Sequence, residues 1–164
     1  MAAEMPPHGA GPAARDQATT AAAMIRTVVK GALATLDRKT GGPYASLVLV
    51  ATDTDGAPVL LLSQLALHTK NIAHDPRASL LIEGADIAAD PMAGGRVSLS
   101  GRIREARAAS SRERFLACHP AAAQYADFPD FAFYRLEIET AHLIQGFGRI
   151  VDIKGAELMA ARKA

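Results

Sequence analysis

Short apolar segments separated by glycine, proline and aspartate constrain the fold of this chain more than any other feature. The polar turn at residues 53–56, for example, divides a β-prone run at 44–52 from another at 59–63, as expected for strands joined by hairpins. Seven such strands at short spacing, with few helices between them, predict a small antiparallel β-barrel that is mainly β with flanking helices. The predicted strands are 32–37, 44–52, 59–63, 78–83, 96–105, 131–140 and 142–152.

Helices are predicted at fewer places. Ala18, Ala21, Ala22, Ile25, Val28 and Val29 recur at three- and four-residue spacing, which predicts a helix over 15–30 that ends at Gly31. Ser110 and Glu113 form a capping-box pattern for a helix that continues to about Cys118, and that lone cysteine is expected to be buried as a small apolar residue. Further short helices are expected at 68–74, 121–125 and 157–161.

Length and composition indicate one domain over 15–164, preceded by a disordered tail over 1–14 that is rich in alanine, proline and glycine. No stretch approaches the ~18 apolar residues of a membrane helix, and no secretory signal precedes the domain. The expectation is a cytoplasmic protein without a membrane partner. A net charge of +1 argues against a nucleic-acid partner, which would favour a basic face.

The segment 60–83 carries the first functional pattern, a strand, a short helix and a second strand. Donor side chains gather where the helix begins, which suits an anion such as a phosphate. His68 is the notable member, although a histidine that simply faces solvent at a helix start fits the residue types as well. The five histidines have no spacing typical of a metal site, and no side chain stands out as a general acid or base. Residues 146–149 read either as part of a phosphate loop or as a glycine kink in a strand.

Three segments, in order, carry a family resemblance: Pro43–Ser46, Ser63–Asn71 and His142–Arg149. They resemble the Pro-Tyr-x-Ser, Ser-x-Leu-Ala-x-His-Thr-x-Asn and His-Leu-x-x-Gly-Phe-Gly-Arg motifs of the pyridoxamine 5′-phosphate oxidase-like, FMN-binding split-barrel superfamily. The matching branch is the one that includes bacterial haem-utilisation proteins. The resemblance covers about three quarters of the chain and implies a homodimeric split barrel with FMN at the interface.

The resemblance also implies roles for individual positions. The strand stretch at 45–48 would line the flavin ring, and Ser63, His68 and Thr69 would hold the FMN phosphate. Arg96 would reach the flavin from the neighbouring subunit, and the last strand would pass near the ring. The implied cofactor-binding residues are Ala45, Ser46, Leu47, Val48, Ser63, His68, Thr69, Arg96, Gln145 and Gly146.

Departures from the family pattern narrow the predicted activity. The arginine and lysine that pyridoxamine phosphate oxidases carry on the strand at 45–50 are absent, as is their Arg-x-His after Arg149, which argues against vitamin B6 oxidation. The chain also stops at Ala164, without the C-terminal extension of haem-cleaving relatives. We therefore expect an FMN-dependent oxidoreductase acting on an unassigned small molecule. The alternatives are a haem-binding or haem-degrading protein, and a dimer that binds a flavin or another small ligand without turnover.

Overall fold

The computed structural model describes residues 12–84, 90, 92–146 and 148–162, which form eight strands and five helices. In chain order the elements are α1 (Pro12–Thr27), β1 (Lys30–Leu36), β2 (Pro43–Leu49), β3 (Ala51–Thr52), β4 (Pro58–Ser63), α2 (Leu67–His74), β5 (Arg77–Glu83), β6 (Gly95–Glu105), α3 (Ala109–Cys118), the 3-10 helix η1 (Pro120–Gln124), β7 (Phe131–Gln145), β8 (Ile150–Lys154) and α4 (Gly155–Arg162). Residues 1–11 of the predicted tail lie outside the described residues.

All strand pairs are antiparallel, in the order β2-β1-β5-β6-β7-β4-β3. The long strand β7 pairs with β6 along one edge. Along its other edge it pairs with β4 through residues 131–135 and with β8 through residues 140–144. The sheet therefore divides at β7, and the predicted split antiparallel barrel is confirmed.

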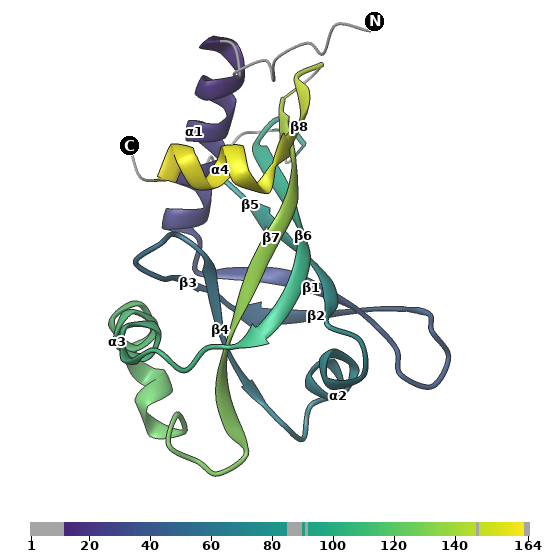
Figure 1. The fold of residues 1–164 in the computed structure, drawn as a ribbon, viewed down its shortest axis with the longest axis vertical. Helices are drawn as coiled ribbons and strands as arrows, with labels where there is room; N and C mark the ends of the chain where they lie inside the picture. The colour runs from purple at the N-terminus through teal and green to yellow at the C-terminus, as the bar shows by residue number, and fades with distance from the viewer. Residues whose placement is uncertain (1–11, 85–89, 91, 147, 163–164) are drawn as a thin grey trace, which may run out of the picture.

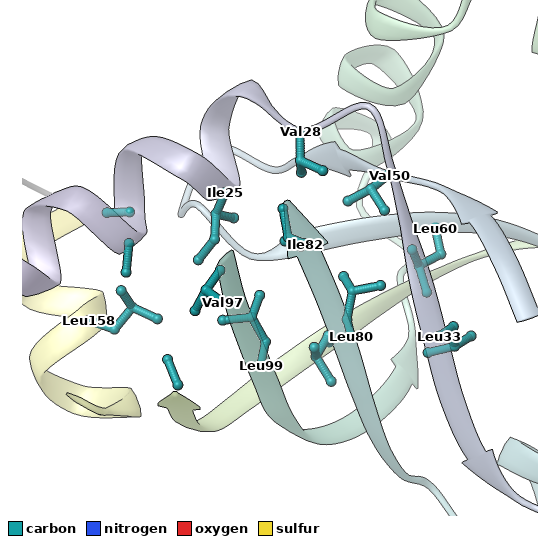
Figure 2. Packing of buried hydrophobic residues seen from close by; sticks show 14 of the residues in the cluster. Ile25, Val28, Leu33, Val50, Leu60, Leu80, Ile82, Val97, Leu99 and Leu158 are labelled. Carbon is teal, nitrogen blue, oxygen red and sulfur yellow. The ribbon is translucent and has the colours of Figure 1, made fainter. Parts of the chain in front are cut away.

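Helices cover the two ends of this sheet. Figure 1 shows α1 and α4 near the β7–β8 hairpin, and α2 and α3 at the opposite end of the long axis. The buried face of α1 is made mostly of alanine, which lets the helix axis lie close to the strands. In Figure 2, Ile25 of α1 and Leu158 of α4 lie beside Val97 and Leu99 of β6, within one continuous core. A smaller core under α3 centres on Phe115, which is fully buried.

The first helix and the strand after it differ in detail from the prediction. α1 covers 12–27 instead of 15–30, because β1 already begins at Lys30, which pairs with Leu49. Val29 therefore lies outside the helix and its apolar stripe, and it is 51% exposed. The predicted strand 44–52 divides into β2 and β3 at Val50, whose N–H donates to the carbonyl of Val29 at 3.0 Å.

The predicted strands 131–140 and 142–152 are divided at the wrong place. β7 continues to Gln145, and the chain then reverses into β8. Gly146 and Gly148 have φ angles of 60° and 83°, which favour glycine, and they lie in the turn of a hairpin. The sequence had left open part of a phosphate loop or a kink within one strand. Residue 147 lies outside the described residues.

Two predictions about α3 are wrong. Its N-cap is Ala108, without a side-chain cap, and so the capping box is not formed. Ser110 and Ser111 instead donate to the carboxylate of Asp53, at 3.3 and 2.5 Å, which ties the helix to the turn after β3. Cys118 is exposed, because it lies at the C-terminal end of the helix, beyond the buried Phe115.

Candidate functional site

The helix α2 is held in place by a buried asparagine. Asn71 is fully buried, and its Nδ2 donates to Thr35 Oγ1 of β1 at 3.1 Å. Its Oδ1 accepts the N–H of Arg38, in the β1–β2 turn, at 3.0 Å. Both ends of the amide are thus used within the protein. Asn71 positions α2 against the sheet and is not available to a ligand.

Fixing α2 brings two of the predicted site residues together. His68 Nδ1 lies 3.0 Å from Ser46 Oγ of β2, so the first turn of the helix contacts the edge strand of the sheet. Burial lowers the pKa of His68 below the ordinary value of 6.5, because the charged imidazolium loses its hydration. Burial thus favours the neutral ring in the ligand-free protein.

Ser63 and Thr69, the other two residues expected at the phosphate, behave differently from each other. The hydroxyl of Ser63 donates to Asp130 Oδ2 at 2.6 Å and accepts the N–H of Leu65 at 3.1 Å. A carboxylate at this position repels an anion. Thr69 is 5% exposed, and its hydroxyl finds no hydrogen-bond partner among the described residues. Thr69 thus has a free donor, while Ser63 does not.

A cavity of about 320 Å³ opens beside these residues, between β2, β4, α2 and the segment that precedes β7. Four predicted residues line it: Leu47, Val48, Ser63 and His68. The other lining residues are Leu49, Leu61, Leu62, Ala66, Tyr125 and Phe131. The wall is apolar apart from Ser63, His68 and the hydroxyl of Tyr125, and it contains no arginine or lysine.

Tyr125 and Phe131 are site residues that the sequence reasoning missed. Their rings form one aromatic wall, with centroids 5.1 Å apart. A usable signal exists in the sequence, because five of its eight aromatic residues fall within the ten positions 125–134. Such local crowding in a chain otherwise poor in aromatic side chains is a reasonable sign of a ligand pocket.

The remaining predicted residues lie elsewhere. On β2, Ala45 is exposed on the face of the sheet opposite to Ser46. Arg96, Gln145 and Gly146 lie where β6 begins and β7 ends, and Arg96 Nη1 donates to the carbonyl of Met92 at 3.0 Å. Arg96 lies six residues along β6 from Arg102, which pairs with Arg77 of β5 close to the end of α2. At the usual rise of a strand, six residues span about 20 Å. One protomer therefore holds two separate groups of predicted site residues.

An eight-stranded antiparallel sheet that divides at one long strand, with helices at both ends and a cavity beside α2, defines a split β-barrel protein. The chain belongs to the CREG β-barrel family, whose model matches residues 12–160.

The descriptions of two similar proteins mention haem. The chain is 39% identical over 132 residues to "Non-canonical heme oxygenase HOZ, chloroplastic" of Arabidopsis thaliana, a match that covers 74% of this chain and 39% of that protein. It is also similar to the structure of a heme binding protein from Mycobacterium smegmatis, with 35% identity and a TM-score of 0.81 over 93% of this chain and 62% of that one. The chain thus spans less than two thirds of either relative.

More distant structures share the fold. A protein described as a putative pyridoxamine 5′-phosphate oxidase from Listeria innocua has a TM-score of 0.61 at 16% identity, over 79% of this chain and 98% of that one. The resemblance to the pyridoxamine 5′-phosphate oxidase-like and haem-utilisation split barrels is confirmed. Among the described helices, none is both long enough and apolar enough to cross a membrane.

The residues around the cavity can be compared with what FMN and haem each need. An FMN phosphate needs donors and positive charge, yet the lining has no cationic side chain and Ser63 is bound to Asp130. A porphyrin needs an extended apolar wall and a neutral imidazole, and the cavity offers leucine, valine and aromatic side chains beside an uncharged His68. Thr69, whose buried hydroxyl has no hydrogen-bond partner among the described residues, does not line the cavity.

Proposed function

We propose that this chain binds haem and takes part in haem degradation. The observation that carries the proposal is its 39% identity to a heme oxygenase over 132 residues. The structurally similar M. smegmatis protein, 35% identical, is described as heme binding. The sequence alone favoured FMN as the cofactor, with haem as an alternative, and the proposal reverses that order.

The geometry supports the proposal through the character of the cavity. Apolar residues of β2 and β4 and the Tyr125–Phe131 wall would contact the faces and edges of the porphyrin. His68 would present a neutral imidazole held by Ser46. Bound haem supplies an iron centre for oxygen chemistry, and the protein supplies orientation and a surface from which water is excluded.

A homodimer would complete this site. The edge strand β2 exposes Ala45, Leu47 and Leu49, and Leu47 is 72% exposed. An edge strand with unpaired backbone groups and apolar side chains favours association with another surface. Association of two copies would let Arg96 and the end of β7 of one copy approach the cavity of the other, and so unite the two groups that one protomer separates.

Titration of the purified chain with ferric haem tests the proposal. We expect a shifted Soret band that saturates at one haem per site, together with a dimer in light scattering. Addition of a reductant under oxygen should then bleach the Soret band with release of an open-chain tetrapyrrole. Binding without bleaching would contradict degradation and leave a haem carrier. A chain that does not perturb the haem spectrum would overturn the proposal.

FMN is the second candidate, and the unpartnered hydroxyl of Thr69 is the observation that favours it. That hydroxyl lies in the first turn of α2, where the N-cap Ala66 has no side-chain cap. A phosphate there would satisfy both the hydroxyl and free backbone amides. Flavin that remains with the chain through gel filtration, with the absorption of oxidised flavin, would support this function in place of the first.

A further inference from the structure

A histidine outside the cavity joins two of the segments that line it. His119 lies between α3 and η1, the short helix that leads to Tyr125, and its Nε2 is 2.8 Å from the carbonyl oxygen of Val50. Val50 directly follows Leu49, the last residue of β2. Leu49 and Tyr125 both line the cavity, whereas His119 does not. The hydrogen bond therefore connects the two segments from behind the cavity lining.

The partner of His119 decides which ring nitrogen carries the proton. A carbonyl oxygen only accepts, so Nε2 is the donor in the neutral ring and in the charged ring alike. The ring also packs against the fully buried ring of Phe115, with centroids 4.8 Å apart. In the main chain, the N–H of His119 donates to Phe115 at 2.8 Å, and its carbonyl accepts from Ala122 at 3.0 Å. Both the ring and the main chain of His119 are thus held.

Val50 is a fixed point of the sheet. Its side chain is fully buried in the large core, and its N–H donates to the carbonyl of Val29 at 3.0 Å. The pairing of β2 with β1 ends one residue earlier, where Leu49 lies opposite Lys30. Because Val50 is held through its side chain and its N–H, the hydrogen bond from His119 places η1 relative to β2.

The aromatic wall of the cavity has a separate support at each end. Phe131 is part of β7, where it pairs with Ser63 of β4. Tyr125 follows η1 instead, and its N–H donates to the carbonyl of Ala122 at 3.1 Å. The position of Phe131 therefore depends on the sheet, and the position of Tyr125 depends on η1 and on His119, where η1 begins.

The other polar bonds from α3 to this part of the sheet lie farther from the cavity wall along the chain. Arg114 Nε donates to the carbonyl of Thr52 at 2.6 Å, and the serines that bind Asp53 are in the first turn of the helix. Figure 1 shows α3 beside β3, the strand next to which these bonds are made. Of these polar bonds, the one from His119 is closest in sequence to Tyr125.

Support of the fold alone is the competing interpretation, because most buried carbonyl groups have a hydrogen-bond partner. Two observations favour a role at the cavity. The carbonyl that His119 binds belongs to the residue after a lining residue. In addition, Ser111 and Phe115 are the two buried residues of α3, so little apolar packing fixes the direction in which this helix leads into η1.

We propose that His119 is a positioning residue of the cavity, because its bond to Val50 sets the distance between Tyr125 and β2. The inference rests on the proposed function, since a flat porphyrin would have to fit beside both walls. A displaced Tyr125 would lose contact with the ring, and haem affinity would fall although no lining residue has changed. His119 would thus act on the ligand only through the wall that it holds.

A fluorescent reporter in the wall tests the positioning directly. The chain contains no tryptophan, so Tyr125→Trp supplies a single one. In this background His119→Phe keeps a ring beside Phe115 and removes the donor, whereas the amide of His119→Gln can donate in place of Nε2. Arg114→Ala is the matched control, because it removes a bond of the same helix away from the wall. We expect acrylamide to quench the tryptophan more strongly in His119→Phe alone.

Haem titration of the same substitutions, in the chain that keeps Tyr125, tests the consequence for the ligand. We expect His119→Phe to bind ferric haem roughly 10-fold more weakly. His119→Gln and Arg114→Ala should bind it as wild type does. Rescue by glutamine distinguishes positioning through the hydrogen bond from a loss of packing. Circular dichroism excludes unfolding, and His119→Leu, a second variant without a donor, must agree with His119→Phe.

Three results would overturn the inference. They are unchanged quenching in His119→Phe, an equal increase in Arg114→Ala, and a His119→Gln variant that behaves like His119→Phe. Unchanged haem affinity in a variant whose tryptophan is more exposed would also overturn it, because the wall would then not matter to the ligand. A wild-type chain that does not bind haem would overturn the proposed function, while the tryptophan reporter would still decide whether His119 holds the wall.

Discussion

His68 and His142 lie on different faces of the same sheet, and each has a partner at Nδ1. His68 contacts the hydroxyl of Ser46 at 3.0 Å in a half-buried cavity, where burial lowers its pKa. His142 contacts the carboxylate of Asp152 at 2.6 Å on an open face. Loss of hydration favours the neutral form of His68, whereas the carboxylate of Asp152 orients the ring of His142. The comparison shows that the partner and the solvent exposure of a histidine, more than its sequence motif, indicate its role.

The two regions also depend on different structural devices. The His142 region depends on a bulge that requires the absence of a side chain at Gly101. The His68 region depends on a side chain, Asn71, which holds α2 against β1. Substitutions at these positions test whether the two regions can be disturbed independently. We expect the effect on stability to be largest at Gly101, smaller at Asn71 and Thr69, and smallest at His68.

Gly101→Ala should have the largest effect. A Cβ at this position would overlap the main-chain oxygen of Glu137, so the β6–β7 bulge would have to open. We expect a loss of about 3 kcal/mol in the free energy of unfolding, measured with urea. Gly95→Ala on the same strand is the control, because its Cβ would meet Met24 only at ordinary contact distance, 3.7 Å. Equal stability of the two variants would show that the bulge can form around a side chain.

Asn71→Ala should come next, with a loss of about 2 kcal/mol in urea unfolding. The substitution leaves the buried hydroxyl of Thr35 and the partly buried N–H of Arg38 without their partner. Lys70→Ala, an exposed change on the same helix, should stay within about 0.5 kcal/mol of wild type. If the two variants are equally stable, then Asn71 is not the anchor of α2.

Thr69→Val should raise the free energy of unfolding of the ligand-free protein by about 1 kcal/mol, because it removes a buried hydroxyl that has no partner among the described residues. Thr35→Val is the matched control. It removes the oxygen that accepts from Asn71, and so it should lower stability by a similar amount. A loss of stability in both variants would mean that the hydroxyl of Thr69 has a partner in solution.

His68 should give the smallest effect, seen as a dependence on pH. Its folded-state pKa is lowered below 6.5, so the unfolded chain takes up the proton first as the pH falls. Well above that value both states are neutral and the residue contributes nothing. Between about pH 7.5 and about pH 5.5, wild type should therefore lose more stability than His68→Asn. Parallel curves would contradict the lowered pKa, which NMR titration of the ring can measure separately.

Local signals in the sequence were enough for much of the fold. Glycine-rich turns and alternating apolar residues placed most strands and the short helix α2 correctly, because both signals act between near neighbours. The motif around His68 predicted a contact with an FMN phosphate, which stays a prediction, whereas its contact with Ser46 and its place in the cavity came from the structure. Tyr125 and Phe131 were missed because their contribution to the cavity depends on contact with β2 and β4, which are distant in the chain.

The sequence by itself determined most of the turns, the split-barrel class and the residues of the α2 motif. Only the tertiary structure decided that Ser63 is bound to Asp130 and that Asn71 serves the fold. It also decided that His142 faces outward to meet Asp152. Ser63 and Asn71 bind residues distant in the chain, which only the fold brings near, and the reason for the direction of His142 is the bulge opposite Gly101. β7 has one more residue than β6 at this point of the pairing. The extra residue exchanges the two faces of β7, so that different side chains point away from the core after it.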